Sequence, residues 1–164
     1  MQTVFLDYAT VSYEDLDSSS ITAAARAAGG DSAVIYHPMT EESAIIGRIR
    51  DAHIVLLNKV KLARVHLEAA RELKLVALAA TGTDNVDLEA AKERGIAVCN
   101  IRGYCTASVA QQVWAMILAL TQHLEDYSRR ARDGSWGRDQ EFDGPAPAIR
   151  ELAGRTLGLS LIHI

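Results

Sequence analysis

Two short segments hold glycine and small polar residues of the kind that bind a small anion. The first, Ala79–Asp87, contains Gly82 in a tight turn between an apolar run and a helical pattern. Glycine lets the main chain approach a ligand closely, and unpaired N–H groups in such a turn suit an anion such as a carboxylate. The second, Gly103–Gln111, begins a long helical pattern, whose N-terminus favours negative charge or a polar ligand. Taken singly, the first pattern also fits a plain strand-to-helix connection, and the second fits ordinary capping by Thr106.

Short apolar runs alternate with helical patterns through the first hundred or so residues. Continuous apolar strands separated by helices indicate a parallel sheet that is covered on both faces. Five such strands with right-handed crossovers predict a doubly wound, flavodoxin-like α/β domain, in which ligands sit at the carboxyl ends of the strands. The predicted strands are Thr3–Leu6, Ala33–Tyr36, His53–Leu57, Leu75–Ala80 and Ile96–Cys99. The predicted helices are Ser18–Ala28, ended by Gly29-Gly30, then Thr40–Ile49, Lys61–Leu73, and Leu88–Arg94 between Asp87 and Gly95.

The pattern changes after this domain. Thr106–Asp133 is predicted to form one long helix with an apolar stripe, ended by Gly134. The polar segment Ser135–Ala148 is predicted to be a loop, and the apolar run Leu152–Ile164 a strand that starts a second domain. We therefore expect three parts: residues 1–101, then a hinge and helix at 102–134, then 135–164.

Composition and charge exclude several classes of protein. Apolar residues make up 49% and charged residues 23%, and the net charge of −4 comes without a basic stripe, so nucleic-acid binding is not expected. The longest apolar stretch, Val113–Leu120, is far short of the roughly 20 residues that span a bilayer. Because the chain has only Cys99 and Cys105 and starts with no secretion signal, we expect a soluble cytoplasmic protein.

Three segments follow one another in an order and spacing that chance does not readily produce. They are ALAATGTDNVDLEAAKERGIAVCN from Ala77, GYCTASVAQQVWAMILAL at Gly103–Leu120, and LAGRTLG at Leu152–Gly158. Together they resemble the D-isomer-specific 2-hydroxyacid dehydrogenase family, most nearly its glycerate dehydrogenase (hydroxypyruvate reductase) branch. The first segment resembles the substrate loop, helix and strand of that family, the second its hinge and long helix, and the third the entry strand of its cofactor domain. The resemblance covers nearly the whole chain, to about Leu159.

The resemblance implies roles for single residues. Thr81 and Gly82 match the loop whose backbone N–H groups hold the substrate carboxylate. Asn58 and Lys59 match a loop near the substrate, where a lysine adds charge complementarity. Cys105 matches a residue that faces the substrate, although no histidine is placed by sequence to activate its thiol, so a packed or exposed thiol is the better interpretation.

The resemblance also implies the chemistry of the parent protein. Thr106 and Val109 match positions that approach the nicotinamide from the substrate side. The implied reaction is the reversible reduction of a small 2-keto acid, such as hydroxypyruvate, to a D-2-hydroxy acid by NADH or NADPH. In that parent a homodimer is expected, because relatives use the long helix in dimer contacts.

The cofactor fingerprint of the family is missing at its expected place. After the entry strand, Gly-x-Gly-x-x-Gly would hold the pyrophosphate, but Leu161 and His163 stand where its first two glycines are expected. The family's Arg, Glu and His, which hold the carboxylate and act as acid/base, are expected beyond the C-terminus, so no catalytic residue is assigned in the chain. We therefore expect this chain to be a fragment, inactive alone and without stable cofactor binding. Residues 160–164 are expected to be foreign to the family, with a diverged terminal strand as the alternative.

Two alternatives remain open. A signalling module of the phospho-receiver type shares the flavodoxin-like fold, and Asp7 and Thr81 stand at strand ends that it uses, but Asn58 occupies the place of its phosphoacceptor aspartate. A pure interaction role without catalysis would use the apolar stripe of the long helix. A metal site is not expected, because the five histidines lie at no metal-ligand spacing from cysteine or acidic residues.

Overall fold

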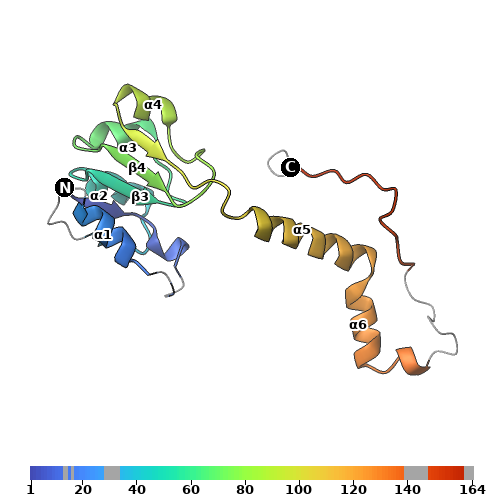
Figure 1. Ribbon diagram of the computed structural model, residues 1–164. Helices are drawn as coiled ribbons and strands as arrows, with labels where there is room; N and C mark the ends of the chain where they lie inside the picture. Colours follow the sequence, from blue (N-terminus) through green and yellow to red (C-terminus); the bar gives the residue numbers. More distant parts are fainter. Residues whose placement is uncertain (13–14, 16, 28–33, 139–147, 161–164) are drawn as a thin grey trace. The chain divides into compact units, whose positions relative to one another are not determined.

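The computed structural model describes residues 1–12, 15, 17–27, 34–138 and 148–160, and the chain divides into two compact units, Met1–Tyr104 and Cys105–Ile164. The first unit contains a five-stranded sheet with the order β2-β1-β3-β4-β5 (Figure 1). Every neighbouring pair of strands in it is parallel. The strands are β1 (Thr3–Phe5), β2 (Val34–Tyr36), β3 (Ile54–Leu57), β4 (Leu75–Leu78) and β5 (Ala97–Cys99). This order confirms the doubly wound, flavodoxin-like fold expected from the apolar runs.

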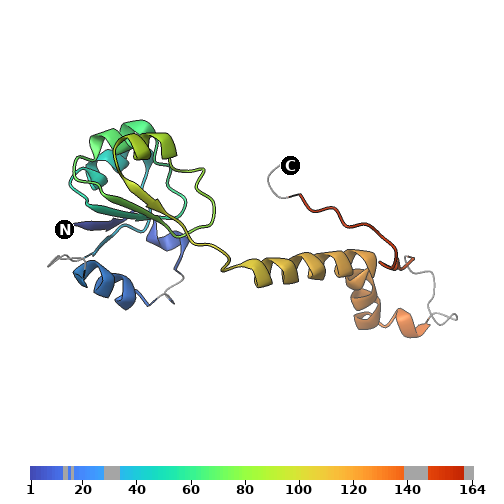
Figure 2. The same cartoon turned by 45° about the horizontal axis from the view of Figure 1, so that its top comes forward.

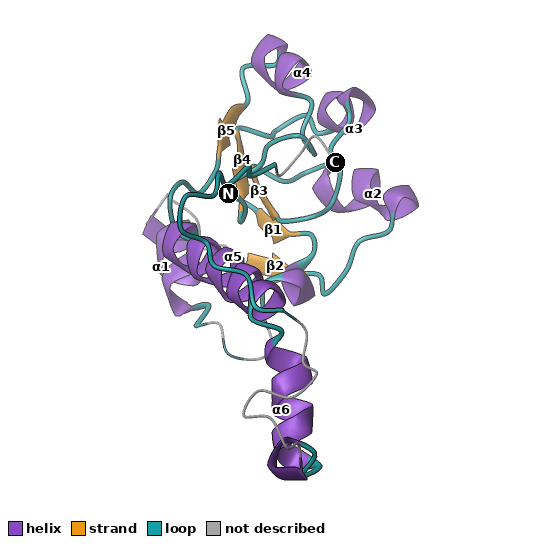
Figure 3. Cartoon of the chain, turned by 90° about the vertical axis from the view of Figure 1, so that its right-hand side faces the viewer, coloured by secondary structure: helices purple, strands orange, loops and turns teal. Residues whose placement is uncertain are grey.

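Helices cover both faces of this sheet. One face carries α1 (Ser19–Ala27), and the other carries α2 (Ile45–Ile49), α3 (Arg64–Ala69) and α4 (Leu88–Glu93), as Figure 2 shows. A short 3-10 turn, η1 (Tyr8–Thr10), follows β1, and a second one, η2 (Glu42–Ala44), precedes α2. Figure 3 shows the strands edge-on between the two helical layers.

The main core lies between the sheet and the layer of α2, α3 and α4. Alternate residues of β3 and β4 point into it and are buried, while their neighbours on the opposite face are only half-buried. Fully burying such an aliphatic side chain stabilises the fold by about 1.5–3 kcal/mol relative to leaving it exposed. The core residues include Val4, Leu6, Ile49, Val55, Leu57, Leu62, Leu67, Val76 and Leu78.

Two predicted helix starts differ from those observed. The helix predicted at Ser18–Ala28 begins at Ser19, whose N–H donates to the carboxylate of Asp17 at 2.8 Å. The helix predicted at Lys61–Leu73 is reduced to Arg64–Ala69, and it starts later than predicted because Leu62 forms a parallel bridge with Val86. The predicted stop at Gly29-Gly30 lies outside the described residues.

The long helix predicted at Thr106–Asp133 is wrong as a single element. The second unit has α5 (Thr106–Thr121), α6 (Leu124–Arg132) and a final 3-10 turn, η3 (Trp136–Arg138). The break falls at His123, which adopts a left-handed backbone with φ 48° and ψ 43°. A left-handed residue directs the chain out of the helix, and histidine is among the non-glycine residues that tolerate this conformation.

The strand predicted at Leu152–Ile164 is also wrong for the part that the structure describes, since residues 152–160 form no strand. A strand needs a partner for its main-chain hydrogen bonds, and these residues are paired with no other strand. Residues 161–164 lie outside the described part. No helix in the described ranges combines the length and apolar character needed to cross a membrane.

Candidate functional site

The loops that follow the parallel strands emerge at one edge of the sheet, its carboxyl edge. Asp7 lies after β1, Asn58 and Lys59 lie after β3, Thr81 and Gly82 lie after β4, and Asn100 lies after β5. This edge is where doubly wound folds bind ligands. The sequence-predicted residues of the first unit therefore all come from the loops of one edge.

The Asp7 carboxylate anchors the loop after β3. Its side chain is completely buried, and its two oxygens accept three backbone N–H groups. Asn58 donates to Oδ1 at 2.9 Å, while Lys59 and Val60 donate to Oδ2 at 2.5 and 2.9 Å. A carboxylate can be buried in this way because charge-assisted hydrogen bonds replace its hydration.

The side chain of Asn58 is also engaged within the protein. Its Nδ2 donates to Oγ1 of Thr10 at 2.9 Å and to the carbonyl of Thr10 at 3.3 Å, and the residue is buried. Lys59, in contrast, is exposed. Of the two residues predicted in this loop, Lys59 therefore has the side chain that can reach a ligand.

Asn85 joins the loop after β3 to the loop after β4. Its Nδ2 donates to the carbonyl of Asn58 at 3.2 Å and to that of Val60 at 3.0 Å. Its own carbonyl accepts the N–H of Leu62 at 2.8 Å. The two predicted substrate loops are thus brought together by direct hydrogen bonds.

The turn at Thr81 and Gly82 is exposed and has unused donors. Among the described residues, the N–H groups of Thr81 and Gly82 find no hydrogen-bond partner. The carbonyl side of the turn is fixed, since Asn100 Nδ2 donates to the carbonyl of Thr81 at 2.7 Å. A Cβ at Gly82 would come within 2.8 Å of an Asp84 carboxylate oxygen, so the turn is compact at this residue. Unpaired N–H groups in a compact, exposed turn are suited to an anion.

Three predicted residues belong to the second unit. Cys105 occupies the N-cap position of α5 without a side-chain cap bond, and its thiol is free and half-buried. Thr106 and Val109 are exposed on the first turn of that helix. Thr106 does not cap this helix, as the ordinary explanation of the segment would require. It is the first residue inside the helix, and Cys105 is the N-cap.

Two histidines of the first unit, His66 and His53, accept main-chain hydrogen bonds. His66 is buried, and its Nδ1 accepts the N–H of Ala63 at 3.1 Å, which satisfies a donor at the start of α3. His53 Nδ1 accepts the N–H of Gln2 at 3.2 Å. Burial lowers the pKa of His37 below its ordinary value of 6.5, and the nearby charge of Arg48 lowers it further. Within the ranges that the structure describes, His, Cys, Asp and Glu side chains form no group that could hold a metal ion.

Two residues of this edge were not assigned a substrate-site role from the sequence. The sequence places Asp7 as a strand-end acid of the receiver alternative, and Asn85 within the Ala79–Asp87 segment. In the structure, the Asp7 carboxylate accepts hydrogen bonds from backbone N–H groups inside the fold. The available signal was its position directly after a buried strand, where an acid is unusual unless it is paired.

Comparisons with known proteins agree with the fold and the motifs. Residues 10–135 match the family model described as "D-isomer specific 2-hydroxyacid dehydrogenase, catalytic domain". The glycerate dehydrogenase of Methylorubrum extorquens is 39% identical over 115 residues, which are 70% of this chain and 37% of that protein. The hydroxypyruvate reductase of Blautia hydrogenotrophica is 31% identical over 161 residues, 97% of this chain and 48% of that protein.

A solved structure shows the same similarity. The D-lactate dehydrogenase of Aquifex aeolicus, complexed with NAD and lactic acid, matches with a TM-score of 0.66 and 26% identity over 92% of this chain and 41% of its own. The chain therefore spans less than half the length of each of these three proteins.

Proposed function

Because the chain belongs to the D-isomer-specific 2-hydroxyacid dehydrogenase family, we propose that it forms the substrate-binding part of an enzyme that interconverts small 2-keto acids and D-2-hydroxy acids. Hydroxypyruvate and D-glycerate are the substrate pair we assign, since the curated relatives carry the names glycerate dehydrogenase and hydroxypyruvate reductase. We assign the substrate-binding role to residues 1–101, the hinge and interdomain helix to residues 102–134, and the start of the cofactor domain to residues 135–164.

One observation carries this proposal: the exposed turn at Thr81 and Gly82 has N–H groups that no described residue uses. In our proposal these N–H groups donate to the substrate carboxylate, and the Lys59 ammonium on the adjoining loop adds attraction. Asn58 shapes that loop from inside, since its amide is bound to Thr10. Cys105 contributes a wall near the substrate and no nucleophile.

The family's nicotinamide cofactor supplies the hydride in the whole enzyme. In this chain, Thr106 and Val109 are exposed on α5 and fit a contact with the edge of a nicotinamide ring. The 164 residues contain no Gly-x-Gly-x-x-Gly, so this chain has no pyrophosphate cradle of that kind. We therefore propose that the chain by itself neither binds NAD or NADP stably nor transfers a hydride.

The test has two arms. Titration of the isotope-labelled chain with hydroxypyruvate, followed by amide NMR, is expected to shift the Thr81 and Gly82 signals before all others. NADH absorbance in the presence of hydroxypyruvate is expected to fall no faster than in a blank. Unchanged Thr81 and Gly82 signals would reject the substrate-binding role, and turnover above the blank would reject the proposed inactivity of the chain alone.

We also propose that the whole enzyme is a cytoplasmic homodimer. Apolar side chains on α5 are exposed, among them Trp114, Leu118 and Leu120, the last at 76%. Exposed apolar helix faces favour self-association, and both cysteines are free thiols, as in a reducing compartment. Light scattering of the 164-residue chain at several concentrations tests whether it self-associates. A monomer at every concentration would contradict self-association through α5.

A further inference from the structure

The backbone of Asn58–Val60 is held from two sides. On its N–H side, the Asp7 carboxylate accepts all three amide protons. On its C=O side, the Asn85 amide donates to the carbonyls of Asn58 and Val60. We call this arrangement, Asp7 and Asn85 around Asn58–Val60, the two-sided clamp. Its centre is Lys59, whose backbone is fixed while the residue stays exposed.

The clamp determines what this loop can offer to an anion. Three successive N–H groups that converge on one carboxylate would themselves make an anion site, but the protein's own Asp7 fills it. A ligand carboxylate therefore cannot use these donors. The group that the loop presents outward is the Lys59 side chain.

The clamp is separate from the interactions that hold the sheet together. β1 and β3 are already paired through their strand ladder, and Leu6 donates to the carbonyl of Leu56 at 2.9 Å beyond it. The Leu62–Val86 bridge joins the two loops further along. Removal of the Asn85 amide would therefore loosen the Lys59 backbone while leaving the ladder and the buried core in place.

We propose that Asp7 and Asn85 are positioning residues that fix Lys59 for binding the substrate carboxylate. This inference rests on the proposed function, in which Lys59 acts beside the Thr81–Gly82 turn. Neither residue touches the substrate in this scheme. Each acts through the backbone of Lys59, because a lysine on a rigid loop loses less conformational freedom when it meets an anion.

The test is a double-mutant cycle in the 164-residue chain, with the affinity for hydroxypyruvate measured by amide NMR. We expect Asn85→Ala and Lys59→Gln each to weaken binding by about two- to fivefold, as suits an exposed charge. If Asn85 acts through Lys59, Asn85→Ala should have no further effect in the Lys59→Gln background. An equal loss in both backgrounds would overturn the inference, whereas no binding by the wild-type chain would overturn the proposed function and the inference with it.

Hydrogen exchange supplies a readout without ligand. Asn85→Ala is expected to speed exchange of the Lys59 and Val60 amides and to leave β3 and β4 protected; unchanged exchange at Lys59 would overturn the clamp. Arg94→Ala is the matched control, because Arg94 also donates to two backbone carbonyls, those of Glu68 and Ala70, away from the loop. Asp7→Asn tests the N–H side of the two-sided clamp, where Asp7 accepts the three amide protons. If this buried variant does not fold, Asn85→Ala still tests the proposal.

Discussion

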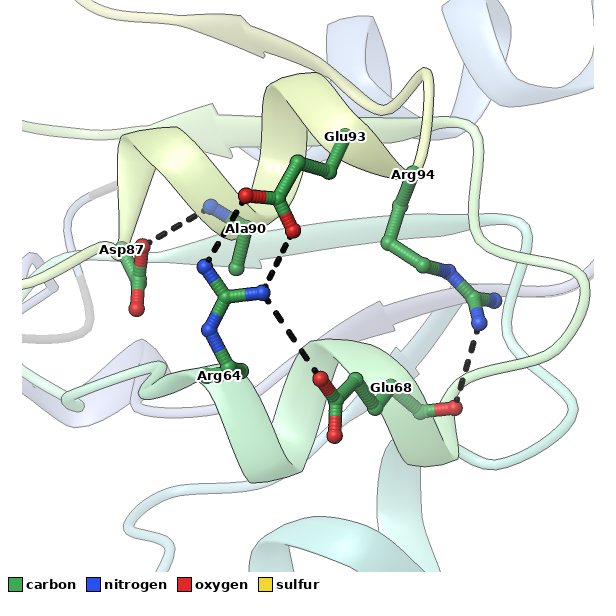
Figure 4. A network of polar contacts seen from close by, with 6 residues as sticks. All are labelled: Arg64, Glu68, Asp87, Ala90, Glu93 and Arg94. Atoms are coloured by element: carbon green, nitrogen blue, oxygen red, sulfur yellow. Dashed lines mark hydrogen bonds and ion pairs between the residues drawn. The ribbon is translucent and has the colours of Figure 1, made fainter.

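Arg64 on α3 and Glu93 on α4 form a two-point ion pair, with Nη1 donating to Oε2 at 2.6 Å and Nη2 to Oε1 at 3.3 Å (Figure 4). Figure 4 also shows Glu68 approaching the same guanidinium, at 3.8 Å. The helices α3 and α4 directly follow the two loops of the candidate site. The pair therefore joins the helix that follows the Lys59 loop to the helix that follows the Thr81–Gly82 turn.

The first prediction concerns the pH dependence of this pair. The hydrogen bond from Arg64, and then its charge, lower the pKa of Glu93 below its ordinary value of 4.5. A carboxyl whose pKa is lowered by folding stabilises the fold above its unfolded pKa, and this contribution is lost as the pH falls through the folded pKa. Glu93→Gln should therefore lower the melting temperature at neutral pH, and the difference from wild type should shrink as the pH falls below 4.5 and disappear below the lowered pKa of Glu93.

Because the pair is exposed, the effect should be small and should decrease with added salt. Glu72→Gln makes the same charge change at an exposed glutamate with no ion pair to described residues, and it should leave the melting temperature nearly unchanged. A Glu93→Gln difference that persists unchanged in acid or in high salt would show that the pair is not its cause.

The second prediction concerns the start of α4. Asp87 accepts the N–H of Ala90 at 2.9 Å, as a helix N-cap does. Asp87→Ala should lower the free energy of unfolding by about 1 kcal/mol, within a range of about 0.5–2 kcal/mol. Denaturant unfolding measures this loss, and Asp84→Ala, which removes an exposed acid from the same loop, is the control. Equal losses in the two variants would argue against capping.

The order of elements in the first unit could be predicted because its strands are continuous apolar runs. Asp87 and Gly95 also marked the ends of α4 correctly, since the signals of a cap and of a left-handed glycine are local. The length of α3 could not be predicted in this way. Its start depends on the bridge between Leu62 and Val86, which a local pattern does not contain.

The candidate site shows the same limit. Gly82 is visible in the sequence because a glycine between a strand and a helix is a local signal. Asp7 and Asn58 are separated by 51 residues, and their hydrogen bond exists only once β1 and β3 are paired. The break at His123 is a further case, since the apolar stripe runs on through a residue whose backbone leaves the helix.

The third prediction concerns His37 and Arg48. Desolvation, and then the charge of Arg48, lower the pKa of His37, so the unfolded chain takes up a proton at a higher pH than the folded chain does. The fold should therefore lose stability through His37 as the pH falls through 6.5 and towards the folded pKa. His37→Gln should lose less stability than wild type between about pH 8 and about pH 5, measured by denaturant unfolding at each pH.

Arg48→Gln should raise the pKa of His37 without restoring its ordinary value, because desolvation is the larger cause and remains. The imidazole proton signals of His37 in an NMR pH titration report this directly. Arg50→Gln removes an exposed neighbouring arginine and should leave the titration unchanged. If His37 titrates alike in the Arg48→Gln chain and in wild type, the electrostatic part of this explanation is wrong.

The fourth prediction concerns the turn that the proposed function uses. In Gly82→Ala, the new methyl group meets only the end of the Asp84 side chain, which can move aside, so the fold should persist. The methyl group stands on the exposed turn and should keep a carboxylate from the N–H groups of Thr81 and Gly82. Loss of one charge-assisted hydrogen bond predicts at least about tenfold weaker binding of hydroxypyruvate.

Gly47→Ala on α2 is the matched control, because a Cβ there meets nothing within 4 Å. It should bind hydroxypyruvate like wild type, and alanine should stabilise its helix slightly. Asp84→Ala combined with Gly82→Ala removes the only close neighbour of the new methyl group among the described residues. If this double variant still binds weakly, the methyl group itself blocks the ligand; if binding returns, the loss came from the displaced Asp84, and the turn's N–H groups remain accessible beside an alanine.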